Sequence, residues 1–136
     1  DGTEKWRYDY RPNSRCYQSP ETSHPQGWYI KAATHEYRGV TYVWDVVKNI
    51  EKAISLPGGI YNFGCSNSLN SYELHLKAAN LLGLKEPEKW IITDEERFHD
   101  EPRNLTMDCS LINEYGIYFP DTIEGMTEVI ERPFRT

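Results

Sequence analysis

RGVTYVWDVVKNIEKAISLPGGIYNFG, residues 38–64, is the stretch that decides the fold. Its apolar side chains recur at helical spacing, which predicts an amphipathic helix: Val43, Val46, Val47, Ile50, Ala53 and Ile54. Pro57-Gly58-Gly59 ends that helix, and the β-prone segment Ile60–Cys65 is then predicted to be an interior strand. A helix that leads into a strand is typical of α/β folds.

The segment before this stretch is predicted to hold a strand and a long loop. Trp6, Tyr8 and Tyr10 alternate with charged residues, as the residues of a half-buried strand do. The range 11–36 contains prolines among serine, threonine, asparagine and glutamine, and it is predicted to be a long loop, which in a compact domain is usually functional or disordered.

Alternating helices and strands are predicted for the rest of the chain. Asn70 with Glu73, and Asp121 with Glu124, match the capping box, which predicts that a helix begins at each place. Strands that alternate with helices favour an α/β class with parallel pairing. The remaining predictions are a strand at 89–93, a helix end at Gly83, and a short helix that Asp108 opens and Gly116 ends.

Composition excludes several classes of function. The chain has 136 residues, so it is one domain or a piece of one. Its formal net charge of −6, without a basic run, argues against a nucleic-acid partner. No apolar run approaches the roughly 20 residues of a membrane helix, and the first residues are not a signal peptide. Three cysteines without metal-ligand spacing are interpreted as free thiols of a cytoplasmic protein: Cys16, Cys65 and Cys109.

Several short motifs follow one another in a defined order. They are Trp6-Arg7-Tyr8-Asp9, Val40-Thr41-Tyr42, Gly59-Ile60-Tyr61, Asn70-Ser71-Tyr72-Glu73 and EPRNLTMD at 101–108. In order and spacing they resemble the extended short-chain dehydrogenase/reductases that act on nucleotide sugars, most closely the dTDP-4-dehydrorhamnose reductase family. The resemblance covers nearly the whole chain and is specific from about Tyr37 onward.

The chain departs from the family's pattern at three places. Val40 stands where the family has proline, and Glu101 stands where it has arginine. The stretch 13–34 does not match, because the family usually places a helix there. The change at Glu101 weakens the expectation that this element binds a phosphate in the family's usual way, and Arg103, two positions on, is the candidate to replace the missing arginine.

The resemblance implies an α/β fold, the C-terminal portion of a Rossmann-like NAD(P)-binding reductase with its last sheet strands and a helical substrate-binding lobe. Residues 1–136 would form a single incomplete domain. In the family, nicotinamide supplies hydride and a tyrosine assisted by lysine supplies a proton. This chain has neither Tyr-x-x-x-Lys nor a glycine fingerprint. It is therefore expected to hold no catalytic and no cofactor-binding residue, and NADP or NAD would bind to a missing N-terminal dinucleotide-binding part.

Four residues are candidate ligands of a nucleotide-sugar substrate under this resemblance. Trp6 and Tyr8 are expected to stack on a base or sugar ring, and Arg103 and Asn104 to contact a diphosphate. The alternative interpretation is structural: two core aromatics at a strand end, a surface arginine and a loop-capping asparagine. No metal site is predicted from the histidines, which are scattered in sequence: His24, His35, His75 and His99.

Two functions of different classes stay open. The first is the substrate-binding part of a nucleotide-sugar reductase or epimerase, inactive without its other part. The second is a non-catalytic regulatory or binding module of the same fold that associates with another enzyme, which the departures at Glu101 and 13–34 favour. A truncated product without a role of its own is the third interpretation, and a homodimer is compatible with the first two.

Overall fold

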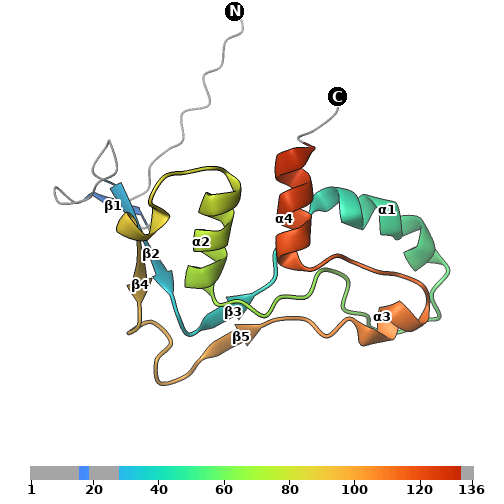
Figure 1. The fold of residues 1–136 in the computed structure, drawn as a ribbon. Helices are drawn as coiled ribbons and strands as arrows, with labels where there is room; N and C mark the ends of the chain where they lie inside the picture. Colours follow the sequence, from blue (N-terminus) through green and yellow to red (C-terminus); the bar gives the residue numbers. More distant parts are fainter. Residues whose placement is uncertain (1–15, 19–27, 133–136) are drawn as a thin grey trace, which may run out of the picture.

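The computed structural model describes residues 16–18 and 28–132 (Figure 1). Its strands are β1 (Cys16–Gln18), β2 (Trp28–Ala33), β3 (Glu36–Arg38), β4 (Ile91–Asp94) and β5 (Arg103–Leu105). Its helices are α1 (Val43–Ile54), α2 (Ser71–Leu81), α3 (Ser110–Glu114) and α4 (Thr122–Glu131), with a short 3-10 helix, η1 (Pro87–Lys89). The strand predicted around Trp6, Tyr8 and Tyr10 lies outside the described residues.

Parallel strands join segments that are far apart in the chain. β2 lies between β1, to which it is antiparallel, and β4, to which it is parallel with Ile30 opposite Ile91. β3 and β5 form a separate parallel pair in which Glu36 lies opposite Arg103. Parallel strands need crossover connections, and here the crossovers contain helices α1 and α2. The α/β class predicted from the sequence is confirmed.

The core lies where α2 packs on the three-stranded sheet. Ala79 of α2 contacts Ala32 of β2 and Ile91 of β4, and all three are almost completely buried. Three partly buried side chains surround this contact: Tyr72, Leu76 and Trp90. Figure 1 shows the sheet and α2 at one end of the molecule, α1 and α3 at the other, and α4 between them.

Local signals in the sequence placed the helices correctly. The Asn70 side chain accepts a hydrogen bond from the Glu73 amide at 2.8 Å, and the Glu73 carboxylate accepts one from the Asn70 amide at 2.9 Å. Asp121 and Glu124 form the same reciprocal pair at 2.9 and 3.1 Å. Gly83, which follows α2, has a φ of +69°, the left-handed conformation that glycine adopts after a helix. Both capping boxes are therefore confirmed.

The strand predicted at Ile60–Cys65 is wrong. These residues form no strand in the described part of the chain, and Ile60 is 97% exposed. The Cys65 amide donates to the Thr41 hydroxyl at 3.0 Å instead of to a neighbouring strand. The segment has the residues of an interior strand, but the described residues provide no strand beside it.

The long loop predicted over 11–36 needs a correction as well. This range contains β1 and β2, and β3 begins at its last residue, Glu36. Prolines and polar residues dominate the first part of the range. Because of them, the short apolar run at the end of β2 was not predicted to be a strand. Pairing with β4, some 60 positions later, determines that this run is a strand.

The buried hydroxyl of Thr122, at the start of α4, forms hydrogen bonds with the segments before and after α1. Thr122, which is 1% exposed, accepts a hydrogen bond from the Val40 amide at 3.0 Å and donates to the Ser66 carbonyl at 3.2 Å. Its oxygen lies 3.0 Å from the Cys65 sulfur, and the Cys65 thiol donates to the Val40 carbonyl at 2.9 Å. The Thr41 hydroxyl completes the cluster through the Cys65 amide.

Replacing Thr122 by valine keeps the shape of the side chain and removes the hydroxyl. The Val40 amide then loses its acceptor, so the free energy of unfolding should fall by about 1–3 kcal/mol. Thr127→Val is the matched control, because the Thr127 hydroxyl donates within α4, to the Ile123 carbonyl; we expect a change below about 0.5 kcal/mol. Urea unfolding followed by circular dichroism measures the free energy of unfolding of both variants. An equal loss of stability in the two variants would contradict the role given to Thr122.

Candidate functional site

Arg103, one of the predicted substrate ligands, is held in place by both its backbone and its side chain. Its backbone amide donates to the His35 carbonyl at 2.9 Å, which fixes the start of β5 beside β3. Its guanidinium lies 3.7 Å from the Glu36 carboxylate, and its side chain is 46% exposed. The guanidinium is therefore anchored on one side and open to solvent on the other.

Glu36 is the anchor of this arrangement. It is fully buried, and its carboxylate accepts a hydrogen bond from the Ser71 hydroxyl, in the first turn of α2, at 2.9 Å. A buried carboxylate is costly unless it is paired and hydrogen-bonded. The ion pair with Arg103 and the hydrogen bond from Ser71 supply part of that compensation, and they join β3, β5 and α2 at one point.

Arg97 and Arg103 both contact the aromatic ring of Phe98. The guanidinium carbons of Arg97 and Arg103 lie 5.0 and 5.5 Å from the centre of the Phe98 ring, within the range of cation–π contacts. Phe98 has a φ of +61°, the left-handed region, which costs about 1–2 kcal/mol for a residue with a Cβ. The Arg97 amide donates to the Asp94 carboxylate at 3.1 Å, which holds the turn where this conformation occurs.

Asn104 is placed differently from Arg103. Its side-chain oxygen accepts hydrogen bonds from the Thr106 amide at 3.0 Å and the Thr106 hydroxyl at 2.6 Å, so it closes a local turn. Successive side chains of a strand point to opposite faces, so Arg103 and Asn104 leave β5 on different sides. Trp6 and Tyr8 lie outside the described residues, and substrate contact by all four residues stays a prediction.

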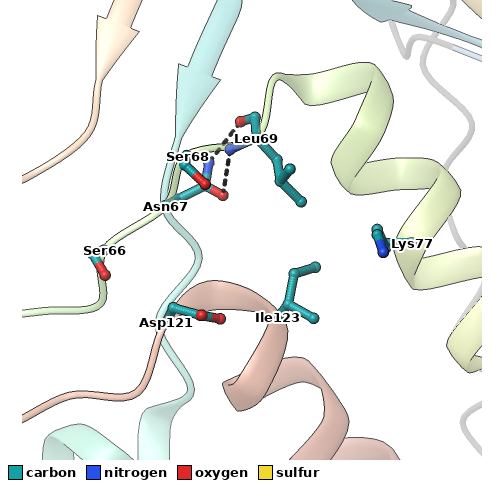
Figure 2. A pocket seen from close by; sticks show the side chains of 7 residues that line it. All are labelled: Ser66, Asn67, Ser68, Leu69, Lys77, Asp121 and Ile123. Atoms are coloured by element: carbon teal, nitrogen blue, oxygen red, sulfur yellow. Dashed lines mark hydrogen bonds between the residues drawn. The ribbon is translucent and has the colours of Figure 1, made fainter.

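A separate cleft of about 430 Å³ lies between α2 and α4 (Figure 2). Its lining residues are Ser66, Asn67, Ser68, Leu69, Lys77, Asp121 and Ile123. The Asn67 amide group donates to the carbonyls of Arg38 at 2.9 Å and Leu69 at 2.8 Å, which shapes one rim. Sequence reasoning did not single out this cleft, because its residues come from three separate segments and the capping box at Asp121 predicts only the start of a helix.

The two cysteines of the described core are not activated nucleophiles. Cys65 is buried and its thiol donates to the Val40 carbonyl. Burial raises the pKa of the Cys109 thiol, which also donates to the Gly64 carbonyl at 3.2 Å. A raised pKa lowers the thiolate fraction, and the thiolate is the reactive form.

Comparisons with known proteins find no match for this chain among family models, curated proteins or solved structures. Within the described residues, no group of three or more histidines, cysteines or acidic residues is placed to hold a metal ion. The same part of the chain contains no helix with the length and apolar character needed to cross a membrane.

The Cys109 thiol should react slowly with alkylating reagents. Iodoacetamide should alkylate Cys109 more slowly than free cysteine at about pH 8, because its raised pKa keeps the thiol protonated. The rate should rise as the pH increases, and it should approach that of free cysteine in urea, where burial is lost. Peptide mass mapping separates Cys109 from the other cysteines, and a rate in the folded protein equal to that of free cysteine would contradict this account.

Proposed function

We propose that this chain is the substrate-binding C-terminal part of an NAD(P)-dependent reductase of a nucleotide sugar, similar to dTDP-4-dehydrorhamnose reductases. It belongs to a Rossmann-like cytoplasmic enzyme and is not catalytic by itself. NADP or NAD binds to a separate N-terminal part, which also supplies the tyrosine and lysine for proton transfer. Our proposal is consistent with a sequence in which none of the ten tyrosines has a lysine four positions later.

The observation that carries the proposal is the anchored, half-exposed guanidinium of Arg103. Guanidinium groups suit phosphate oxygens because their N–H groups form a planar fork that donates two parallel hydrogen bonds. Glu36 and Phe98 restrict the Arg103 side chain without covering it, so less rotamer entropy is lost when a diphosphate binds. Arg97 brings a second positive charge to the same aromatic ring.

The role of this chain is to bind and orient the substrate. Parallel strands β3 and β5 bring Arg103 beside Glu36, and the Ser71 contact fixes both against α2. A rigid ligand set of this kind holds the diphosphate so that the sugar carbonyl faces the hydride donor of the other part.

The second candidate function is a non-catalytic regulatory or binding module. Glu101, which is exposed, occupies the position of the family's arginine and places a negative charge two residues from Arg103. Large apolar side chains are also exposed on α1, including Val47 and Ile54 at 48% and 82%, as in proteins that associate with a partner.

A measurement of dTDP-sugar binding distinguishes the two candidate functions. In the full-length natural protein, Arg103→Ala should weaken dTDP-sugar binding by about 10–100-fold, since a hydrogen bond to a charged group contributes about 1.5–3 kcal/mol. Arg132→Ala, at the exposed end of α4, is the control and should leave the affinity unchanged. Isothermal titration calorimetry measures the affinity and NADPH absorbance measures turnover.

Each result has a defined meaning. Equal affinities of the two variants would contradict the role of Arg103. If the unchanged protein bound no nucleotide sugar and oxidised no NADPH, the reductase proposal would be wrong and the regulatory module favoured.

A further inference from the structure

The cleft between α2 and α4 carries a positive charge on one wall and a negative charge on the other. Lys77 belongs to α2, and Asp121 is the residue that caps α4 (Figure 2). Within the described residues, the Lys77 side chain forms no hydrogen bond and no ion pair. Asp121 uses its Oδ1 atom to accept a hydrogen bond from the Glu124 amide, and its Oδ2 atom accepts none from the described part of the chain. Both charges therefore remain available to a ligand.

Two apolar side chains lie between these charges. Leu69 and Ile123 are partly buried, and they point toward one another from opposite walls of the cleft in Figure 2. The same view shows Asp121 on one side of Ile123 and Lys77 on the other. A complementary ligand has apolar atoms in its middle and opposite charges at its two ends.

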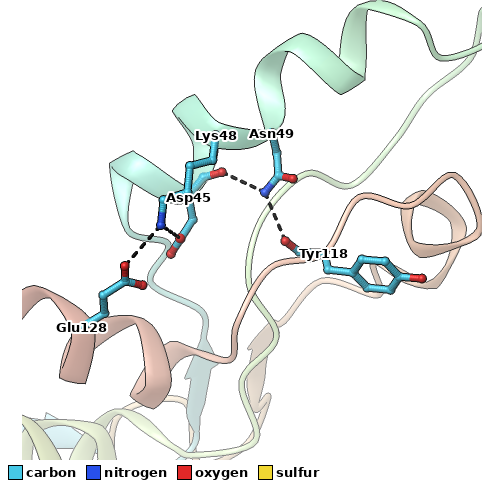
Figure 3. Close-up of polar contacts among 5 residues, drawn as sticks. All are labelled: Asp45, Lys48, Asn49, Tyr118 and Glu128. Carbon is cyan, nitrogen blue, oxygen red and sulfur yellow. Dashed lines mark hydrogen bonds and ion pairs between the residues drawn. The ribbon is translucent and has the colours of Figure 1, made fainter.

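Several contacts hold the walls of the cleft in place. The Ser66 carbonyl accepts hydrogen bonds from the Thr122 amide at 3.0 Å and from the Thr122 hydroxyl at 3.2 Å. Glu128, further along α4, forms an ion pair with Lys48 of α1 at 3.2 Å (Figure 3). Because these contacts exist without a ligand, the cleft is largely preformed, and less conformational entropy is lost on binding.

We propose that this cleft binds a short ω-amino acid, a zwitterion whose ammonium and carboxylate groups are separated by a chain of methylene groups. The ligand ammonium pairs with Asp121, the ligand carboxylate pairs with Lys77, and the methylene groups pack on Leu69 and Ile123. Separated charges of opposite sign on the protein are matched by separated charges on the ligand. The cleft volume of about 430 Å³ admits a chain of six heavy atoms with its two charged ends.

The positions of the two charges disfavour other small ligands. An α-amino acid carries both charges on one carbon atom, so it pairs with Lys77 or with Asp121 and not with both. A simple carboxylate leaves Asp121 without a partner, and a phosphate is repelled by the Asp121 charge. The residues around Phe98 do not line this cleft, so it is separate from the site proposed to bind a diphosphate.

Methyl NMR of the full-length natural protein tests this site with 6-aminohexanoate as the probe. We expect the methyl signals of Leu69 and Ile123 to shift until the site is saturated. The Kd should be on the order of millimolar, because ion pairs at exposed sites are weak. Norleucine has the same atomic composition as 6-aminohexanoate but carries its ammonium group next to the carboxylate, and it should bind at least about threefold more weakly.

Two substitutions remove one charge each and preserve the walls of the cleft. Lys77→Met keeps the apolar part of the side chain, and Asp121→Asn keeps the cap of α4, because asparagine and aspartate are equally good caps. Each should weaken 6-aminohexanoate binding by about two- to fivefold, the range for an exposed ion pair. Lys85→Met, at an exposed lysine that does not line the cleft, is the control and should leave the affinity unchanged.

Three results would overturn the inference. They are methyl signals of Leu69 and Ile123 that show no saturable shift, equal affinities for 6-aminohexanoate and norleucine, and an affinity that Lys77→Met leaves unchanged. Circular dichroism checks that each variant is folded, and if Asp121→Asn is not, Lys77→Met alone decides. None of these measurements involves a nucleotide sugar, so their outcome is independent of the proposed function.

Discussion

The hydroxyl of Thr122 is the constraint on which the arrangement of the helices depends. It joins α4 to two segments that are distant from it in sequence, at Val40 and at Cys65–Ser66, and it does so where water is excluded. Gly39 and Gly64 permit the close approach, since a Cβ on Gly64 would lie 2.8 Å from the Thr41 hydroxyl and 2.5 Å from Met107. The capping box that begins at Asp121 fixes the start of α4, and with it the position of this hydroxyl.

Features encoded by neighbouring residues could be predicted from the sequence. The capping boxes at Asn70 and Asp121 depend on residues three positions apart, and the helical period of α1 is visible within a single segment. Strand assignments depended on partners elsewhere in the chain. β2 was missed because β4 defines it, and residues 60–65 were assigned to a strand although the described chain offers no neighbour.

In the candidate site, too, a feature encoded by neighbouring residues could be predicted, and features that depend on distant residues could not. Arg103 was identified from a motif, but its anchor Glu36 was not, because a single glutamate next to Tyr37 gives no sign that it will be fully buried. Only the parallel register of β3 and β5 brings the two together. No motif marked Arg97 or Phe98, and the contacts of Arg97 and Arg103 with the Phe98 ring arise at a left-handed turn that the sequence did not indicate.

Polar contacts determine the orientation of α1. If α1 turned Val43, Val47, Ile50 and Ile54 inward, Asp45 and Asn49 would face solvent. The Asn49 hydrogen bond to the Tyr118 carbonyl and the ion pair of Lys48 with Glu128 would then be lost. The observed orientation keeps these polar contacts and leaves Val43, Val47, Ile50 and Ile54 48–82% exposed. Polar contacts on the inner side of α1 fix the direction in which its exposed apolar side chains point.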